Sequence, residues 1–244
     1  MGVDPAASRP DGASDRVGDG RVARIRAALP PDAGSAPRLC EVSRDLTRAA
    51  GAAVALRAPE GVLGTLCATD AVSRRIDELQ FTLGEGPSLD AFVSGRPVSA
   101  ARLEEAAAAR WPAFTPAAAA AGAAAVFSFP LHVGAARLGT LDLYQRVPGP
   151  LGDEQHADAL VVADLAARWI LGVQAAAPEG HLAAELDGGA DLRPLVHNAA
   201  GIVSVQLGVS ITEALIRLRA HAFREDRPLR DVAADVVARK VRIS

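Results

Sequence analysis

The sequence is poor in the residues that build metal sites and in the segments that direct a chain to a membrane. Its two cysteines, Cys40 and Cys67, do not have CxxC spacing, and two thiols are too few for a four-cysteine zinc site. No apolar run reaches the roughly 20 residues of a membrane-spanning helix, and the N-terminal segment lacks the apolar centre of a signal peptide. We therefore expect a cytoplasmic protein without a membrane segment. Both thiols would then normally stay reduced, although one disulfide is possible in principle.

Lysine is nearly absent, and the basic side chains are almost all arginines. The net charge of -3 hides an asymmetry along the chain. Residues 190–244 hold nine Arg or Lys and six Asp or Glu, whereas residues 1–189 hold 17 and 23. A basic excess at the C-terminus suits a polyanionic partner, but small helical domains often differ by a few charges without any function. Charge alone leaves both interpretations open.

No group of residues has the spacing of a catalytic centre. His132 and His156 are isolated, and no nucleophile–base pair or carboxylate dyad is evident. The run Gly84-Glu85-Gly86-Pro87 lacks the Lys-Ser/Thr of a P-loop and the full GxGxxG spacing. We interpret this run as a rigid turn that shapes the wall of a pocket. We predict that the protein is not an enzyme, and no cofactor or metal is indicated.

Residues 17–172 have the pattern of an α+β domain with an antiparallel sheet flanked by helices. Residues 1–16, rich in Gly, Pro, Asp and Ser, are expected to form a disordered tail. Hairpin turns are expected at 59–61 and 134–135. The expected helices are 17–29, 37–50, 70–79, 88–93 and 153–171, with a further helical stretch around Trp111 and Phe114, and the expected strands are 52–58, 61–69, 97–101, 123–133 and 136–146.

Three details of this domain are specific enough to be checked. Asp70 and Asp153 are the expected N-caps of their helices. Cys67 lies in an apolar strand pattern and is expected to be a buried thiol, and Trp111 and Phe114 are expected to anchor the core. The apolar residues of helix 153–171 track one broad face, which either forms the seam of a dimer or lies on its own sheet. They are Ala157, Leu160, Val161, Leu165 and Ile170, with Asp164 as an exception.

Residues 173–190 are expected to form a linker, and residues 191–244 an all-α module of three amphipathic helices. The first helix covers 195–207 and ends at Gly208. Ser210 and Glu213 have the spacing of a capping box at the start of the second helix, which runs to about residue 224. Pro228 opens the third helix, with apolar residues at core spacing through Val237.

The C-terminal pattern resembles the ANTAR domain, a three-helix RNA-binding module of bacterial transcription antiterminators. The resemblance covers residues 190–243 and rests on His197–Gly201, Gln206–Ser210, 213–222 and 228–236. It implies that the module binds paired RNA hairpins and stops a terminator from forming. ANTAR domains often have a basic residue where this chain has Ala200, so the arginines of the second helix would contribute more.

The upstream pattern resembles a GAF domain of the kind fused to ANTAR in actinobacteria. This resemblance covers residues 36–172 and rests on Leu83–Pro87, Asp90–Phe92, 95–97, 110–114 and 129–141. It implies a domain that regulates the RNA-binding module, usually within a dimer. The expected partners are RNA hairpins, a second copy of the chain, and a small-molecule ligand or a partner kinase at the GAF-like domain.

The candidate RNA-binding residues come from all three C-terminal helices. Three of them, Arg217, His221 and Arg224, follow three- and four-residue steps and share one side of the second helix. Arginine suits phosphates and base edges through its planar fork. The full set is His197, Asn198, Gly201, Gln206, Arg217, Arg219, His221, Arg224, Arg230, Arg239 and Lys240.

Each of these candidates also has a structural interpretation. The arginines could form a solvated face with Glu213, Glu225 and other nearby acids, and His197 and Asn198 equally suit the start of a helix. Gly201 inside a helix indicates close approach, by a neighbouring helix or by a nucleotide.

The predicted function is an RNA-binding transcription antitermination regulator. Two alternatives belong to other classes of protein. Residues 207–210 followed by a helix resemble a DNA-binding helix-turn-helix, and basic helices could also dock an acidic protein partner, as in an interaction adaptor.

Overall fold

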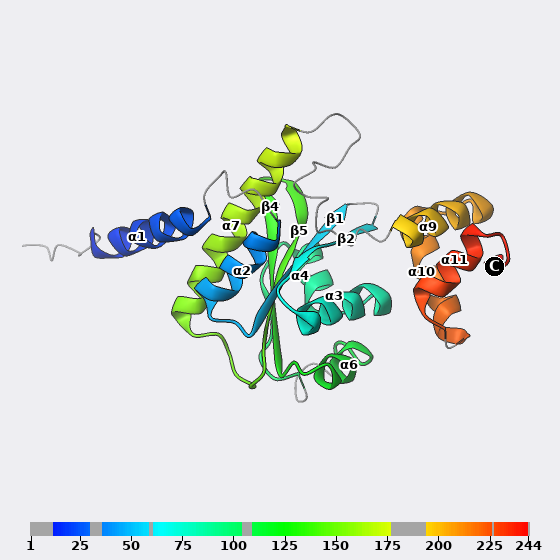
Figure 1. Cartoon of the computed structure of the whole chain (residues 1–244), viewed down its shortest axis with the longest axis horizontal. Coiled ribbons are helices and arrows are strands. Elements are labelled where there is room, and N and C mark those ends of the chain that lie inside the picture. The colour runs from blue at the N-terminus through cyan, green and yellow to red at the C-terminus, as the bar shows by residue number, and fades with distance from the viewer. Residues whose placement is uncertain are drawn as a thin grey trace, which may run out of the picture.

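The computed structural model describes residues 12–29, 36–58, 61–103, 109–176, 194–225 and 227–243. An N-terminal α+β domain is followed by a C-terminal module of three helices (Figure 1). The predicted linker lies mostly outside the described residues. Its first residues, 173–175, are helical and extend the preceding helix, which is therefore longer than predicted.

The N-terminal domain is built on one five-stranded sheet. Its strands are β1 (Gly51–Ala58), β2 (Gly61–Ala68), β3 (Val98–Ala100), β4 (Ala125–Val133) and β5 (Ala136–Gln145). Their order is β2-β1-β5-β4-β3, and every neighbouring pair is antiparallel. The α+β class and the pairing of both predicted hairpins are confirmed.

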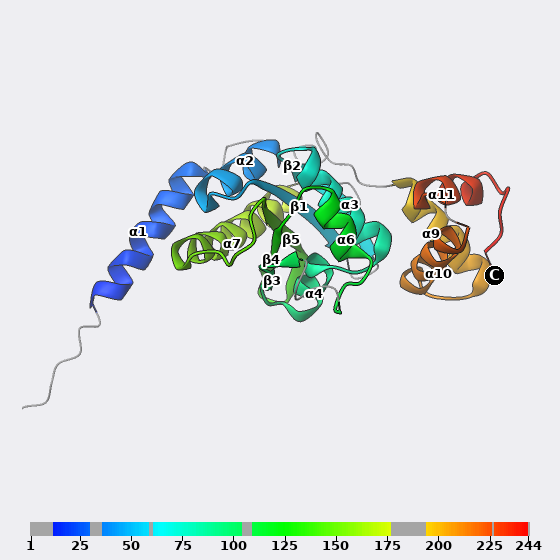
Figure 2. The ribbon, with the colours of Figure 1, turned by 90° about the horizontal axis from the view of Figure 1, so that it is seen from below.

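Helices cover both faces of this sheet (Figures 1 and 2). On one side lie α2 (Ala36–Thr47) and α7 (Asp153–Ala175), with α1 (Gly12–Ala28) against α7. On the other side lie α3 (Ala71–Leu83), α4 (Pro87–Ser94) and α6 (Phe114–Ala120). Trp111 and Phe114 are buried beside α3, which confirms them as core anchors.

Strand alternation gives the two faces of the sheet different chemistry. The side chains of Val54, Leu141 and Phe129 join the apolar core under α2 and α7. Their neighbours Arg57 and Asp142 point to the opposite face, because successive side chains of a strand alternate. That polar face is also buried, since α3 and α4 cover it.

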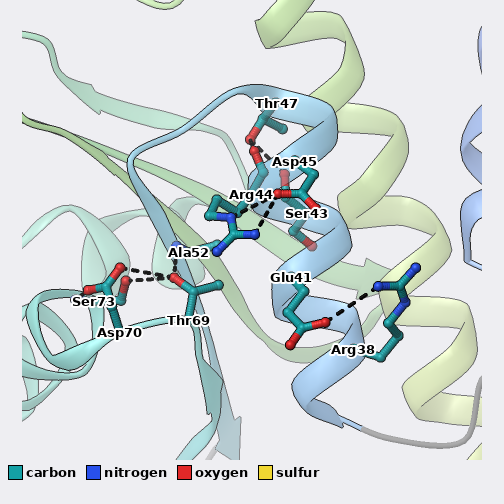
Figure 3. A network of polar contacts seen from close by, with 10 residues as sticks. All are labelled: Arg38, Glu41, Ser43, Arg44, Asp45, Thr47, Ala52, Thr69, Asp70 and Ser73. Atoms are coloured by element: carbon teal, nitrogen blue, oxygen red, sulfur yellow. Dashed lines mark hydrogen bonds and ion pairs between the residues drawn. The ribbon is translucent and has the colours of Figure 1, made fainter.

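The start of α3 is held by a cluster of polar side chains next to β1 (Figure 3). Asp70 is the N-cap, and its carboxylate accepts a hydrogen bond of 2.8 Å from the backbone N–H of Ser73. The hydroxyl of Thr69 accepts a hydrogen bond from the backbone N–H of Ala52 at 3.0 Å. The predicted cap at Asp70 is confirmed, but α3 continues one turn beyond Leu79 and ends at Gly84.

Several predicted helix boundaries are wrong. Gly152, rather than Asp153, is the N-cap of α7, and its N–H donates to Gln155 Oε1 at 3.0 Å. Helix α2 ends at Thr47 because Arg48 adopts a left-handed conformation with a φ of 51°. Helix α1 begins at Gly12, so residues 12–16 of the predicted tail are helical; residues 1–11 lie outside the described residues.

The packing face of α7 also differs from the prediction. Val162, Ala166 and Ile170 are buried against the sheet, so this face lies on the domain's own core. Leu160, which the apolar pattern placed on the same face as Ile170, is 43% exposed. Many small alanines along α7 made its two sides hard to distinguish from the sequence.

Cys67 is not a free thiol. It forms a disulfide with Cys40 of α2, and both residues are buried. The expectation of two reduced cysteines is therefore wrong. Cys40 and Cys67 are 27 residues apart in the sequence, and only the packing of α2 against β2 brings them together.

The C-terminal module consists of α9 (Pro194–Leu207), α10 (Ile211–Arg224) and α11 (Leu229–Val237). Gly208 ends α9 with a φ of 66°, and the hydroxyl of Ser210 accepts a hydrogen bond from the backbone N–H of Glu213 at 3.1 Å. These signals confirm the three predicted helices. Val237 is 37% exposed and does not belong to the core, contrary to its predicted spacing.

Candidate nucleic-acid interface

An open groove of about 940 Å³ runs between α9 and the segment that follows α11. Its walls include Ile202 and Val205 from α9, and Val237 and Val241 from the end of the chain. Val205 is 86% exposed. With Ile202, Val237 and Val241 it forms a group of apolar side chains along the groove, and contiguous exposed apolar surface marks binding sites.

Four of the predicted RNA-binding residues line this groove from α9. His197, Asn198, Gly201 and Gln206 all face it, although nine residues separate the first from the last. The three- and four-residue repeat of an α-helix places them on one side of α9. The side-chain amides of Asn198 and Gln206 can both donate and accept hydrogen bonds.

The opposite wall supplies the positive charge. Arg239 and Arg242 line the groove and are both exposed. Arg239 has a φ of 57°, and this left-handed turn ends α11. Ile243 is buried in the core of the module and anchors the end of the segment. Arg242 and the apolar lining residues were not among the predicted site residues, because their convergence depends on this turn.

Gly201 is open toward the groove. A Cβ built at Gly201 would meet no atom outside its own helix within 4 Å. Close approach by a neighbouring helix, one of the two interpretations of this glycine, is therefore contradicted. Ala200, the position that is basic in many ANTAR domains, is fully buried in the module's core.

Three predicted residues of α10 lie outside the groove and have partners within the module: Arg217, His221 and Arg224. Arg217 forms an ion pair with Glu213 at 3.0 Å, one helical turn earlier. Arg224 contacts His221 Nδ1 at 2.8 Å and Glu225 at 3.3 Å. These contacts agree with the alternative interpretation of the arginines, in which they form a solvated face with Glu213 and Glu225.

The remaining predicted cations are split between two environments. Arg230 is exposed on α11, and Lys240 lies 3.8 Å from Asp235. Asp235 is also bound by Arg227 at 2.6 Å, and this hydrogen bond lowers the pKa of the Asp235 carboxyl. The pairing fixes the loop between α10 and α11 against the end of α11.

Arg219 is separated from the other predicted residues. Its guanidinium carbon lies 5.2 Å from the centroid of the Phe81 ring, which belongs to α3 of the N-terminal domain. Phe81 is buried in a hydrophobic cluster whose other buried members come from residues 196–243. The contact therefore joins the two domains.

A second polar site lies inside the N-terminal domain, between the sheet and helices α3 and α4. Arg57 Nη2 donates to Ser88 Oγ at 2.7 Å, and Ser88 Oγ lies 2.6 Å from Thr140 Oγ1. Gln80 links this group to α3, because its Oε1 accepts from the backbone N–H of Ser88 at 2.7 Å. Burial raises the pKa of Asp142, the carboxyl at the end of this network, to about 6.

The Gly84–Pro87 turn has a defined structural role. It connects α3 to α4, and Glu85 Oε1 accepts hydrogen bonds of 2.7 Å from the backbone N–H groups of Ala113 and Phe114. Glu85 thereby satisfies free N–H groups at the start of α6. The predicted rigid turn is observed, and Leu83 at its start lines a cleft between the two domains.

Within the described residues, no group of three or more His, Cys, Asp or Glu is arranged to hold a metal ion. No single described helix is long and apolar enough to cross a membrane. Helices α9 and α10 together reach that length and composition but are bent by 105°.

The two parts of the chain match two regulatory domains, a sensory domain and a helical module of an RNA-binding class. Residues 36–170, more than half of the chain, match the GAF domain, and residues 184–237 match the ANTAR domain. The chain belongs to the GAF family and carries an ANTAR domain at its C-terminal end. Both predicted domain families are confirmed.

The solved structures that are similar to this chain cover its N-terminal domain. The GAF domain of a phosphoenolpyruvate-protein phosphotransferase from Coxiella burnetii is 13% identical, with a TM-score of 0.50, and covers 65% of this chain and 95% of that chain. The GAF domain of the Acinetobacter phosphoenolpyruvate-protein phosphotransferase is 10% identical, with a TM-score of 0.48 and coverages of 69% and 99%. These likenesses describe the fold alone. No curated protein matches the chain.

Proposed function

We propose that this chain is a transcription antitermination regulator that binds RNA hairpins through its C-terminal module, under the control of its GAF domain. The observation that carries the proposal is the groove between α9 and the end of the chain. Its apolar lining suits the faces of unstacked bases, and the amides of Asn198 and Gln206 suit their edges. Arg239 and Arg242 suit phosphates.

The open position of Gly201 supports a nucleotide ligand. A helical glycine costs about 1 kcal/mol relative to alanine, and no neighbouring helix uses the space above this one. A base or sugar lying on α9 would use it. In this proposal His197 contributes within the groove. The contact extends toward the hairpin stem through Arg217, His221 and Arg224 of α10, Arg230 of α11 and Lys240 beyond α11.

A filter-binding titration with a two-hairpin RNA tests RNA binding. We expect the double variant Arg239→Ala/Arg242→Ala to lower affinity about tenfold or more. The slope of log affinity against log salt should also become shallower by about 1.4, because each lost phosphate contact removes about 0.7 on single-stranded RNA. The matched control is Arg75→Ala/Arg168→Ala, which removes two exposed arginines from the GAF domain.

Antitermination is tested by single-round transcription on a template that carries the hairpins and a terminator. We expect added protein to increase readthrough, and the Arg239→Ala/Arg242→Ala variant to lose this increase while the control variant keeps it. If Arg239→Ala/Arg242→Ala kept full RNA affinity, the groove would be rejected as the RNA-binding site. RNA binding without any gain in readthrough would reject antitermination alone.

We also propose that the chain acts as a dimer. Leu160 and Leu171 are exposed on the side of α7 that faces away from the sheet, at 43% and 37%. Light scattering after size exclusion tests this proposal, with Leu160→Glu as the disrupting variant. A monomer mass for the unmodified protein at micromolar concentration would contradict it.

DNA binding is the second candidate function. Helices α9 and α10 are bent by 105° across residues 208–210, which is the geometry of a helix-turn-helix. However, the first turn of α10 carries Ile211, Thr212 and Glu213 and no cation. Recognition helices contact bases with this part, so the charge distribution favours RNA. Competition between duplex DNA and hairpin RNA at equal salt separates the two functions.

A further inference from the structure

The contact between Arg219 and Phe81 places one predicted RNA-binding residue against the GAF domain. The guanidinium lies over the ring, 5.2 Å from its centroid. Arginine attracts an aromatic face through its charge and stacks on it through its plane. Phe81 is 3% exposed, so its ring is occupied on all sides in this arrangement.

The same arginine also lies along the turn that ends α3. Gly84 has a φ of 71°, and a Cβ built there would lie 3.2 Å from Arg219 Nη1 and 3.4 Å from Arg219 Cδ. A cleft of about 590 Å³ adjoins this contact. It is lined by Thr82, Leu83 and Ala113 on the GAF side and by α10 and the start of α11 on the other. Both overall views place the C-terminal module beside the end of α3 (Figures 1 and 2).

RNA would compete with Phe81 for Arg219. Arginine recognises unstacked bases by the interaction it makes here, with its plane laid on a π face. The guanidinium face that lies on the Phe81 ring is not available to a base, and Thr82 and Leu83 of the GAF domain face this part of α10 across the cleft. The groove between α9 and the end of the chain lies on other residues and stays open.

We propose that the GAF domain masks the RNA-binding surface of α10 by holding Arg219 on Phe81, so that full RNA affinity requires the two domains to separate. This inference rests on the proposed RNA-binding function. The contact has a direct link to the interior of the GAF domain, because the preceding residue, Gln80, belongs to the buried polar network beside Ser88 and Asp142. A change in that network would shift the end of α3, and Phe81 with it.

Two variants on the GAF side test the masking without changing the RNA-binding module. Phe81→Ala removes the ring, and Thr82→Arg places a second cation in the cleft from an exposed position. We expect each to raise the affinity of the full chain for two-hairpin RNA at least threefold. Hydrogen–deuterium exchange across residues 211–224 should become faster in both, which reports domain separation independently of RNA.

The chain offers a matched control for each variant. Phe127→Ala removes another phenylalanine of the GAF domain that is 3% exposed, from the core under α2 and α7. Ser94→Arg adds the same charge at an exposed position at the end of α4. Both controls should leave RNA affinity and the exchange of α10 unchanged.

The possible outcomes separate this inference from the function on which it rests. Faster exchange with unchanged RNA affinity would show that the contact masks nothing, and unchanged exchange would show that it does not hold the domains together. Either result overturns the masking. If the unmodified chain and both variants all fail to bind RNA, the proposed function fails and the masking fails with it. If only the variants bind RNA, both proposals are supported.

Discussion

Cys40 of α2 and Cys67 of β2 are joined by a disulfide across 27 residues of sequence. Closing a loop of this length restricts the unfolded chain and stabilises the folded one by about 3.5 kcal/mol in the chain-entropy model. We expect reducing agent to lower the free energy of unfolding of the GAF domain by about 2–4 kcal/mol in urea titrations. The variant Cys40→Ser/Cys67→Ser should not respond to reductant. Equal urea midpoints for the unmodified chain with and without reductant would contradict this prediction.

The buried carboxyl of Asp142 should make stability depend on pH. Burial raises its pKa from 3.8 to about 6, and Arg57 and Asp77 are the charged groups that face it. Because the folded pKa is the higher one, protonation favours the folded state. The stabilisation by Asp142 is complete when the pH is below the carboxyl's unfolded pKa and is lost as pH rises through 6. The total loss in the free energy of unfolding is about 3 kcal/mol.

The variant Asp142→Asn isolates this effect. Unfolding free energies measured between pH 4 and pH 7 should fall by about 3 kcal/mol more in the unmodified chain than in Asp142→Asn. Asp164→Asn is the control, because Asp164 is exposed on α7 and pairs with Arg168 at 2.9 Å. Parallel pH profiles for the unmodified chain and Asp142→Asn would rule the prediction out.

Gly201 allows stability and RNA binding to be separated. Because a Cβ there meets no atom outside its own helix within 4 Å, Gly201→Ala should raise the free energy of unfolding by about 0.5–1 kcal/mol. Gly201→Leu should fill the groove and lower RNA affinity about tenfold without unfolding the module. Gly172→Leu is the matched control, since Gly172 is an exposed helical glycine in α7 with equally open surroundings. Unchanged RNA affinity in Gly201→Leu would exclude Gly201 from the contact.

Glu85 should contribute to stability without taking part in RNA binding. Its carboxylate accepts from two backbone N–H groups at the start of α6, at 2.7 Å each. We expect Glu85→Ala to lower the free energy of unfolding by about 1–2 kcal/mol, as for the loss of a helix cap, and Glu85→Gln to lower it less. Glu78→Ala, which removes an exposed ion pair with Arg75, should have almost no effect. Thermal unfolding compares the stability of the three variants. An equal loss of stability in Glu85→Ala and Glu78→Ala would contradict the role of Glu85 as a cap of α6.

Local signals predicted the helical elements of the C-terminal module well. Gly208, Ser210 and Pro228 act on the few residues next to them, so their effect is readable from the sequence. The same holds for Asp70 at the start of α3. The packing side of α7 was predicted wrongly, because its alanines make both sides weakly apolar, and only the position of the sheet decides which side is buried.

The candidate site also combines residues that were predicted from the sequence with residues that only the tertiary structure places there. The residues of α9 that face the groove were predicted from the resemblance to the ANTAR domain, and the structure shows that they line one groove. Arg242 and Val241 reach the groove through the left-handed turn at Arg239, which no local pattern indicated. Arg219 was grouped with the other arginines of α10, but its neighbour is Phe81, 138 positions earlier in the chain.

The sequence by itself determined the two families, the α+β and three-helix classes, and the order of the elements. The families follow from the resemblance of short motifs, and the classes and the order of elements follow from hydrophobic periodicity and caps, which act over a few residues. Only the tertiary structure decided the Cys40–Cys67 disulfide, the buried polar network around Asp142 and the contact between Arg219 and Phe81. Each of these joins residues that are far apart in the chain, so it exists only after the helices have packed on the sheet and the module has met the end of α3.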